Sequence, residues 1–182
     1  MLRKQPPSTV KLICAFIYSR EDIYERVITF LAQKYGKIDF QSPAIDFNFT
    51  DYYEPEMGKN LTRRFISFDK LVNADRLADI KDFCIKIEKK FAPAQKRRIN
   101  IDPGYINEAK LVLATTKDFH HRIYLKNGIF AEITLAYSAK EKNFTDLSTT
   151  FPDYRTKEYK EILLHIRGLY RSRLKGLTKP DA

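Results

Sequence analysis

The stretch Arg97–Thr134, with the sequence RRINIDPGYINEAKLVLATTKDFHHRIYLKNGIFAEIT, decides the fold of this 182-residue chain. Within it, Asn127-Gly128 lies between two runs in which apolar and polar residues alternate, which is a strong signal for a β-hairpin. A turn is predicted ahead of this region, at Asp102-Pro103-Gly104. An antiparallel β-meander is therefore expected, with strands over residues 110–117, 121–125 and 129–137.

The chain before this stretch begins with the order strand, helix, strand. Residues 10–18 are apolar apart from Lys11, which is typical of a central strand buried on both faces. A helix is predicted from Ser19, with Asp22 completing a capping box, and it ends at Gly36. From there the apolar period changes to two, which predicts a broken strand over residues 38–49.

A further strand over residues 61–68 is followed by a helix from Asn73 to Pro93, which has an apolar stripe at helical spacing. This order matches a ferredoxin-like βαββα start, for which Arg97–Asp102 can supply the last strand. The expected fold class is α+β, a mainly antiparallel sheet extended by the meander, with helices on one face and a C-terminal helix. A single domain is expected over residues 1–182. Its parts are a flexible lead-in (1–9), the βαββα half (10–94), the β-meander with the polar site (95–150) and the C-terminal helix (155–175).

The chain carries a formal net charge of +10, and such an excess of Lys and Arg is the electrostatic signature of phosphate binding. Half of the surplus lies from Arg155 onward, where eight Lys or Arg stand against three Asp or Glu. A basic C-terminal helix and tail account for that half without a nucleic-acid groove. Nucleic acid is therefore a possible partner that the charge alone does not favour.

The chain is expected to be soluble and cytoplasmic, without a membrane partner. Its N-terminal apolar run, residues 10–18, is too short to span a bilayer and follows KQPPST rather than a basic segment. Cys14 and Cys84 both lie in apolar patterns, where a thiol acts as a small hydrophobic group. This cysteine usage fits a reducing compartment.

Alternation along the predicted strands sorts their side chains onto two faces. The apolar face is expected to hold Ile99, Ile101, Ile123, Leu125, Ile133 and Leu135. The opposite face collects Arg98, Asn100, Asp102, Arg122, Tyr124, Glu132 and Thr134, with Lys117 and Asp118 at the end of a neighbouring strand. A solvated sheet face is the simplest explanation. The mixture of Arg, Asn, Asp and Tyr favours a binding site instead.

Within this site, Arg98, Lys117 and Arg122 are the candidate phosphate contacts, and Asp102 and Glu132 are placed to hold a hydroxyl group or a metal ion. His121, Asp102 and Glu132 are the candidate catalytic residues. Asn100, Asp118, Tyr124 and Thr134 complete the candidate ligand-binding set. The identity of any metal or cofactor stays open.

The orientation of His121 is the least determined feature of this site. Strict alternation places His120 with Arg122 and points His121 toward the core, where a histidine bonded to the backbone is common. The turn at residues 117–119 is able to reset this register. Whether His121 reaches the polar face is therefore left to the structure.

Signatures of known catalytic and phosphate-binding sites are missing. Gly58-Lys59 is followed by Asn60 and lacks the earlier glycine of a phosphate loop, and HExxH, CxxC and GxSxG motifs do not occur. The sequence therefore names no reaction, and whether the protein is an enzyme stays open.

The blocks DFNFTDYYEPEMG, RRINIDPGY, LATTKDFHHRIYL with GIFAEITL, and TFPDYRT resemble an uncharacterised family of small bacterial and archaeal proteins, domain of unknown function 4416. The resemblance covers nearly the full chain and brings no established activity. A GTP-binding label carried by some members has no support from a phosphate loop here. The resemblance implies that these residues belong to the family pattern: Asp51, Tyr52, Tyr53, Gly58, Asn100, Asp102, Gly104, Tyr105, Lys117, Asp118, His121, Arg122, Tyr124, Glu132, Asp153, Tyr154 and Arg155. It favours the binding-site interpretation over a solvated face.

Three functions are compatible with these observations. The first is binding of, or action on, a small anionic ligand, a nucleotide or phosphorylated metabolite, at the polar sheet face. The second is an RNA-binding module that uses the basic charge and aromatic residues on a sheet surface. The third is a structural or protein-interaction role, with the aromatic residues of positions 47–53 as the contact.

Overall fold

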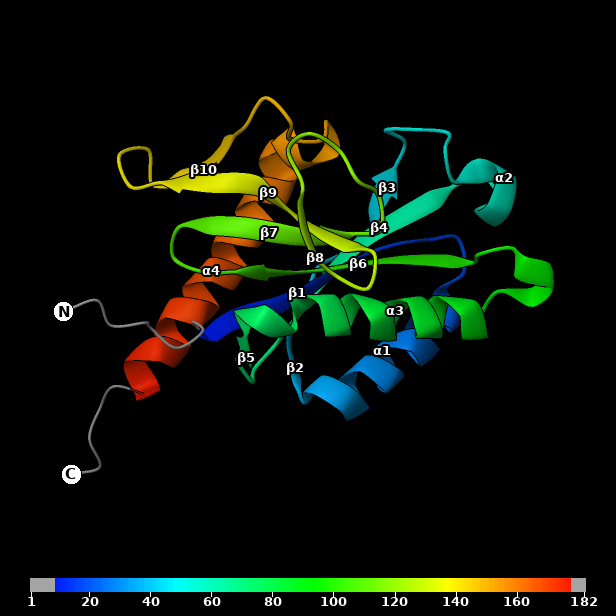
Figure 1. The fold of residues 1–182 in the computed structure, drawn as a ribbon, viewed down its shortest axis with the longest axis horizontal. Coiled ribbons are helices and arrows are strands. Elements are labelled where there is room, and N and C mark those ends of the chain that lie inside the picture. Colours follow the sequence, from blue (N-terminus) through cyan, green and yellow to red (C-terminus); the bar gives the residue numbers. More distant parts are fainter. Residues whose placement is uncertain (1–8, 178–182) are drawn as a thin grey trace.

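The computed structural model describes residues 9–177, which form one mainly antiparallel sheet with helices packed against it (Figure 1). Ten strands belong to the sheet, in the order β10-β9-β7-β6-β1-β4-β2, with β3 on β4, β5 on β1 and β8 on β9. The strands are β1 (Thr9–Tyr18), β2 (Ile38–Gln41), β3 (Ile45–Phe47), β4 (Leu61–Phe68), β5 (Val72–Asn73), β6 (Ile99–Ile106), β7 (Lys110–Thr115), β8 (Ile123–Lys126), β9 (Ile129–Ser138) and β10 (Asn143–Asp146). The predicted α+β class is confirmed.

The helices are α1 (Glu21–Tyr35), α2 (Glu54–Met57), α3 (Leu77–Lys90) and α4 (Lys157–Leu177), with short 3-10 turns η1 (Ala74–Arg76), η2 (Pro93–Gln95) and η3 (Asp153–Arg155). None of the described helices is long and apolar enough to cross a membrane. The predicted lead-in falls on residues 1–8, outside the described residues, and on Thr9, which begins β1.

Strand β1 lies at the centre of the sheet, as its apolar sequence predicts. It pairs antiparallel with β4 on one side and β6 on the other, and β4 pairs with β2. The order β6-β1-β4-β2 is that of a ferredoxin-like sheet, with β6 as the last strand. Lys11, the one charged residue in the apolar run, is buried and paired with Asp39 of β2.

The two faces of β1 pack against different helices (Figure 1). Leu12, Cys14 and Phe16 join the buried residues of α1 and α3 in one apolar cluster. Ile13 and Ala15 join those of α4 in another. Helices α1 and α3 thus lie on one face of the sheet, as expected, and the C-terminal helix α4 covers the opposite face.

The turn predicted at Asp102-Pro103-Gly104 is wrong, because these residues lie within β6 and pair with β1. The turn composition is overridden by close packing between strands. A Cβ atom at Gly104 would lie 2.3 Å from the backbone oxygen of Val112 on β7, so only glycine fits there. Pairing with β7 begins at Gly104, immediately after the proline.

The apolar face predicted for the meander is only partly correct. Ile99, Ile101 and Leu135 are fully buried, but Ile123 is 69% exposed, and Leu125 and Ile133 are exposed as well. Strand β8 pairs only with β9, and all of its residues are exposed, so it is not a core strand. In β9 the pairing with β7 skips Thr134, a β-bulge that breaks the alternation between Ile133 and Leu135.

The predicted starts of α1 and α3 also differ from the structure. The Ser19 hydroxyl donates to the backbone oxygen of Met57 at 2.7 Å, and α1 begins at Glu21 without a side-chain cap. Asn73 ends β5, and its side chain does not cap the 3-10 turn that precedes α3. Ser19 thus makes a tertiary hydrogen bond, and Asn73 pairs with β1, where the local sequence predicts helix caps.

Replacement of Gly104 tests the close approach of β6 and β7. We expect Gly104→Ala to lower the free energy of unfolding by about 1–3 kcal/mol or more, because backbone atoms must move to admit the new methyl group. Gly168, inside α4, has open space around it, and there the change to Ala should raise stability by about 0.5–1 kcal/mol. Urea denaturation of both variants measures the contrast, and equal effects would contradict it.

Candidate functional site

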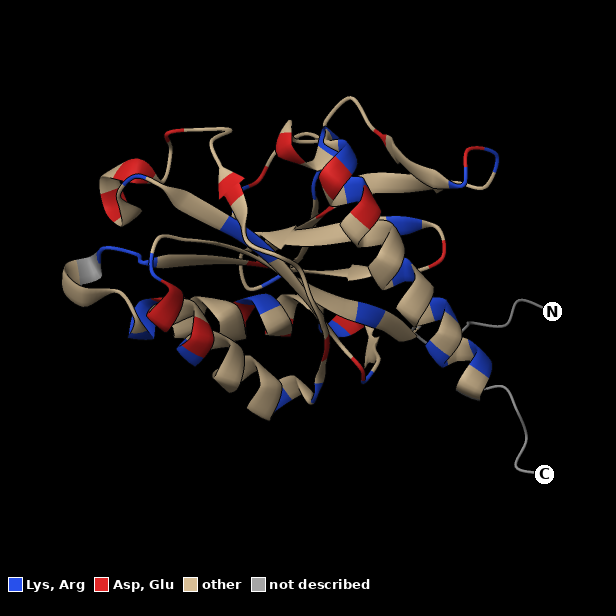
Figure 2. Ribbon diagram, turned by 180° about the vertical axis from the view of Figure 1, so that it is seen from behind, with Lys and Arg blue, Asp and Glu red and all other residues tan. Residues whose placement is uncertain are grey.

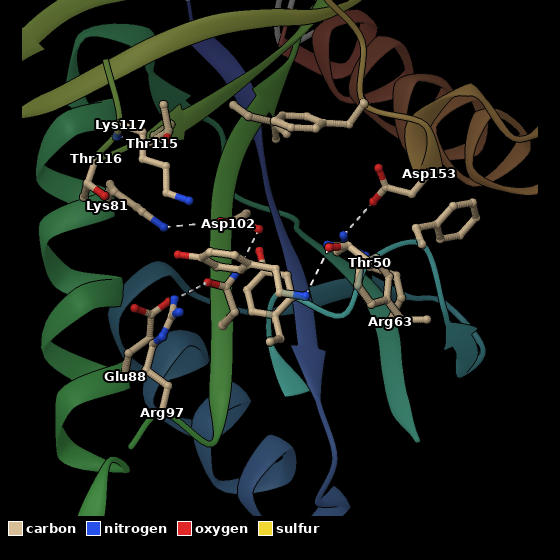
Figure 3. Close-up of a pocket in the computed structure, with 18 of the residues that line it drawn as sticks. Thr50, Arg63, Lys81, Glu88, Arg97, Asp102, Thr115, Thr116, Lys117 and Asp153 are labelled. Carbon is tan, nitrogen blue, oxygen red and sulfur yellow. Dashed lines mark hydrogen bonds and ion pairs between the residues drawn. The ribbon is translucent and has the colours of Figure 1, made fainter. Parts of the chain in front are cut away.

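A cavity of about 1020 Å³ lies beside the point where β6 and β7 separate (Figure 3). The two strands pair only over Gly104–Ile106, although β6 begins at Ile99. The part of β6 that pairs with β1 but not with β7 contributes Asn100 and Asp102 to the cavity wall. The other walls are provided by helix α3, by the start of the β7–β8 loop and by the segments around residues 47–56 and 151–154. Its size lies near the upper end of small-molecule sites, roughly 300–1,000 Å³.

A row of alternating charges and an amide follows one wall of the cavity. Arg97 makes two hydrogen bonds to the Glu56 carboxylate, from Nε to Oε2 at 2.6 Å and from Nη2 to Oε1 at 3.2 Å. Its Nη1 donates to Oδ1 of Asn100 at 3.2 Å, and Asn100 Nδ2 donates to Oδ2 of Asp102 at 2.7 Å. Lys81 Nζ lies 3.4 Å from Oδ1 of Asp102 and ends the row.

Lys81 and Glu88 of α3 bind the main chain of β6 where β7 does not reach it. Lys81 donates to the backbone oxygen of Ile101 at 2.7 Å, and Glu88 Oε1 accepts from the Ile101 amide at 2.6 Å. Burial raises the pKa of Glu88. Burial alone lowers the pKa of Lys81, but the charges of Asp102 and Glu88 outweigh it, so the pKa is raised. Side chains of α3 thus replace a neighbouring strand here.

A second cluster surrounds the buried Glu132 of β9. Arg122 Nε donates to Oε2 of Glu132 at 2.6 Å, and His121 Nε2 lies 3.2 Å from the same oxygen. Arg122 Nη1 donates to the backbone oxygen of Lys117 at 3.0 Å. These contacts attach the β7–β8 loop to the sheet and neutralise the carboxylate. The turn before β8 therefore directs His121 toward Glu132 rather than into the apolar core.

The opposite side of the cavity holds a buried ion pair between β4 and the segment before α4. Arg63 Nη2 donates to Oδ2 of Asp153 at 2.7 Å, and both side chains are almost fully buried. Burial raises the pKa of Asp153 even though Arg63 acts in the opposite direction. The Arg63 guanidinium is 4.9 Å from the centre of the Phe47 ring.

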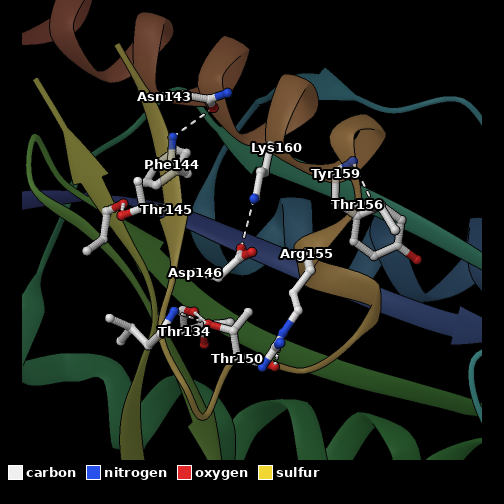
Figure 4. A network of polar contacts seen from close by, with 12 residues as sticks. Thr134, Asn143, Phe144, Thr145, Asp146, Thr150, Arg155, Thr156, Tyr159 and Lys160 are labelled. Atoms are coloured by element: carbon white, nitrogen blue, oxygen red, sulfur yellow. Dashed lines mark hydrogen bonds and ion pairs between the residues drawn. The ribbon is translucent and has the colours of Figure 1, made fainter. Parts of the chain in front are cut away.

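Hydrogen bonds to β9, within the segment itself and to the first turn of α4 fix the segment that carries Asp153 (Figure 4). The Thr150 hydroxyl donates to the backbone oxygen of Thr134 at 2.6 Å, and Arg155 Nε donates to the backbone oxygen of Thr150 at 2.9 Å. Thr156 Oγ1 accepts from the Tyr159 amide at 3.3 Å and so caps α4. The β-bulge at Thr134 thus helps to position the ion pair.

Aromatic side chains form much of the remaining cavity wall. They are Phe47, Phe49, Tyr52, Tyr53, Phe151 and Tyr154. Three of them, Phe49, Tyr52 and Phe151, are at least 40% exposed. Lys117 Nζ lies 4.2 Å from the centre of the Tyr52 ring, and a hydrogen bond from Lys117 lowers the pKa of Tyr52. The cavity therefore combines one charged wall with one aromatic wall.

The structure brings together five of the predicted site residues, since Asn100, Asp102, Lys117, Arg122 and Glu132 all line the cavity. His121 is held next to them by Glu132 but is not part of the lining.

Four predicted residues lie apart from the cavity. Arg98 precedes β6, and Asp118 is exposed in the β7–β8 loop. Tyr124 is 59% exposed and packs on Phe130, while Thr134 is buried in the β-bulge. The bulge in β9 accounts for Thr134, and the exposed position of β8, which pairs with β9, accounts for Tyr124; alternation reveals neither feature.

Seven charged residues of the cavity lining were not among the predicted site residues: Glu56, Arg63, Lys81, Glu88, Lys89, Arg97 and Asp153. For two of them the sequence does carry a signal. Lys81 and Glu88 continue the spacing of Leu77 and Cys84 on α3, so they occupy the buried face of the helix as charged members of an apolar stripe. Nothing in the local pattern indicates that Arg63 meets Asp153, because 90 positions separate them.

No group of three or more His, Cys, Asp or Glu side chains within residues 9–177 is arranged to hold a metal ion. The carboxylates of the cavity are instead paired with cations or amides. The arrangement suits recognition of a ligand that offers hydrogen-bond acceptors to Lys and Arg and an apolar surface to the aromatic wall.

The fold and the cavity together define an α+β protein with a ferredoxin-like core and a cavity lined by aromatic and charged side chains. The family model described as "Domain of unknown function (DUF4416)" matches residues 8–170, and the chain belongs to this family. Comparison with curated proteins and with solved structures gave no match.

The raised pKa of Glu88 leads to a prediction about stability and pH. Its ordinary pKa is 4.5, and in the folded protein it lies higher, so above about pH 4.5 the folded state retains a proton that the unfolded state has lost. This contribution makes the folded state less stable as pH rises. Glu88→Gln removes it and can still accept from the Ile101 amide. The stability of the variant relative to the wild type should therefore increase from pH 4 to 7 in urea denaturation, and a constant difference would contradict this.

Proposed function

We propose that this protein binds a small anionic ligand, a nucleotide or a phosphorylated metabolite, in the cavity between α3, β6 and β7. The observation that carries this proposal is Lys117, a solvent-exposed cation of the cavity lining that, like Lys89, takes part in no ion pair among the described residues. No described carboxylate lies within ion-pair distance of its ammonium group, whereas Arg97 and Arg122 are both paired with glutamates. A phosphate group on the ligand would supply the missing negative charge.

The aromatic wall supports a ligand that also has an apolar or aromatic part. Exposed aromatic side chains cost free energy in water, and Phe49, Tyr52 and Phe151 gather around the same cavity. A planar base could stack on these rings while its phosphate approaches Lys117. Within the proposal, nucleotides therefore rank ahead of sugar phosphates.

The catalytic roles of His121, Asp102 and Glu132 remain predictions. Asp102 has the most exposed side chain of these three residues. Its side chain is 28% exposed, compared with 17% for His121 and 4% for Glu132. Asp102 is therefore the residue proposed to face a ligand hydroxyl group. Glu132 and His121 are proposed to hold Arg122 in place. The unlinked thiols Cys14 and Cys84 are compatible with the proposed cytoplasmic location.

The RNA-binding and protein-interaction alternatives receive less support. Helices cover both faces of the central strand β1, and the exposed sheet surface on β8 and β9 presents Ile123 and Ile133 beside Tyr124 instead of a row of aromatic rings on which RNA bases stack. Basic residues do follow α4 (Figure 2), but the cavity lies elsewhere. Phe47 and Tyr53, in the segment suggested as a protein contact, pack with each other.

A thermal-shift screen against nucleotides, sugar phosphates and divalent metals tests the proposal. A ligand at a hundred times its dissociation constant should raise the melting temperature by roughly 5–11 °C, from about 2.7 kcal/mol of added stability. Lys117→Ala should weaken the binding roughly tenfold to hundredfold, the effect expected from losing a hydrogen bond to a charged group.

Lys140→Ala is the matched control, because Lys140 is exposed between β9 and β10 and does not line the cavity. If Lys117→Ala binds every hit as the wild type does, the cavity is not the site. Affinity for RNA that falls steeply with salt and depends on α4 would favour the RNA-binding alternative.

A further inference from the structure

Arg63 is a buried cation with unused hydrogen-bond donors. The residue is 3% exposed, and only its Nη2 group has a partner, Asp153. Its Nε and Nη1 atoms are buried and have no hydrogen-bond partner among the described residues. A buried donor left without a partner costs about 1–3 kcal/mol and more on a charged group, so native structures rarely keep one without a reason.

The surroundings of Arg63 do not satisfy these donors. Aromatic rings enclose the guanidinium, with the centres of the Phe65, Tyr154 and Tyr159 rings 5.7–5.8 Å from Cζ. The hydroxyl groups of Tyr154 and Tyr159 are also buried and are not in hydrogen-bond geometry with a partner; burial raises the pKa of both hydroxyl groups, and the nearby Arg63 opposes that rise. Several polar atoms without partners therefore gather around one charge.

Arg63 also lines the cavity, on the side opposite α3 (Figure 3). Figure 3 shows its side chain extending from β4 toward Asp153, across the cavity from Lys81 and Asp102. The Nε and Nη1 atoms are closed off from the cavity in this structure, so a molecule there completes the hydrogen bonds of Arg63 only when the aromatic rings around the guanidinium move apart. The ring of Phe47, whose centre is 4.9 Å from Cζ of Arg63, belongs to the same lining.

We propose that Arg63 is the anchor for the ligand's anionic group, a phosphate or carboxylate whose oxygens accept hydrogen bonds from Nε and Nη1. This inference rests on the proposed function and gives the bound ligand a direction. One anionic group lies at the buried Arg63 end, and the remainder of the ligand extends past the aromatic wall, where a further phosphate of the ligand meets Lys117. Arg63, rather than Arg122 or Arg98, is then the arginine that selects the ligand.

Phenyl phosphate and benzoate are suitable probes, because they share an aromatic ring and differ in the anion. Isothermal titration of each into the wild type, Arg63→Lys and Lys117→Ala shows whether phosphate or carboxylate is preferred. Arg63→Lys keeps the positive charge but loses the fixed geometry of the guanidinium, so affinity for the preferred probe should fall at least about tenfold. Arg64→Lys is the matched control, since Arg64 pairs with Glu21 and does not line the cavity.

A measurement on the wild type avoids dependence on the folding of the Arg63 variant. The Nε–H resonance of Arg63, assigned by through-bond correlation, should shift on titration with the preferred probe and saturate at the same concentration as the heat signal. Binding that depends on Lys117 without a shift at Arg63, or with unchanged affinity in Arg63→Lys, overturns the anchor and leaves the proposed function standing. Absence of binding by both probes overturns the anchor and also removes support for the proposed function.

Discussion

The burial of β1 on both faces is the constraint on which the rest of the structure depends. A strand without a polar face must be covered by two separate layers, and here α1 with α3 cover one face and α4 covers the other. The strand also needs neighbours on both edges, which β4 and β6 supply. The cavity forms at the outer edge of this arrangement, where β6 extends beyond the end of β7.

At that edge, charged residues perform a structural task as well as lining the cavity. The amide and carbonyl of Ile101 would lack partners where β7 ends, and Glu88 and Lys81 provide them. Buried charges require compensation, so Asp102 pairs with Lys81, and Asn100 and Arg97 extend the row to Glu56. The polar wall of the cavity therefore includes the side chains that satisfy the main chain of β6 where its pairing with β7 ends.

The sequence predicted the fold class well because its strongest patterns have local causes. The apolar run in β1, the stripes of α1 and α3 and the Asn-Gly turn each determine an element from neighbouring residues. The meander was predicted less accurately, since a β-bulge at Thr134 and the close contact at Gly104 depend on pairing between distant strands. Alternation alone cannot locate either feature.

The candidate site was predicted in part for the same reason. Asn100, Asp102 and Glu132 lie on strands whose alternation is regular up to the bulge, and they reach the cavity. Arg98 precedes β6, and Tyr124 lies on the exposed edge strand β8, so neither reaches the cavity. Arg63 and Asp153 meet only in the folded chain, so no local pattern could have joined them.

The distance along the chain between Arg63 and Asp153 has a consequence for folding. Arg63 is synthesised 90 residues before its partner, and the segment that holds Asp153 is fixed by β9 and by the start of α4. An unpaired guanidinium strongly favours water, so we expect the β4 side of this cavity to stay hydrated in partly folded chains. Dehydration of this region then has to wait for the segment that carries Asp153.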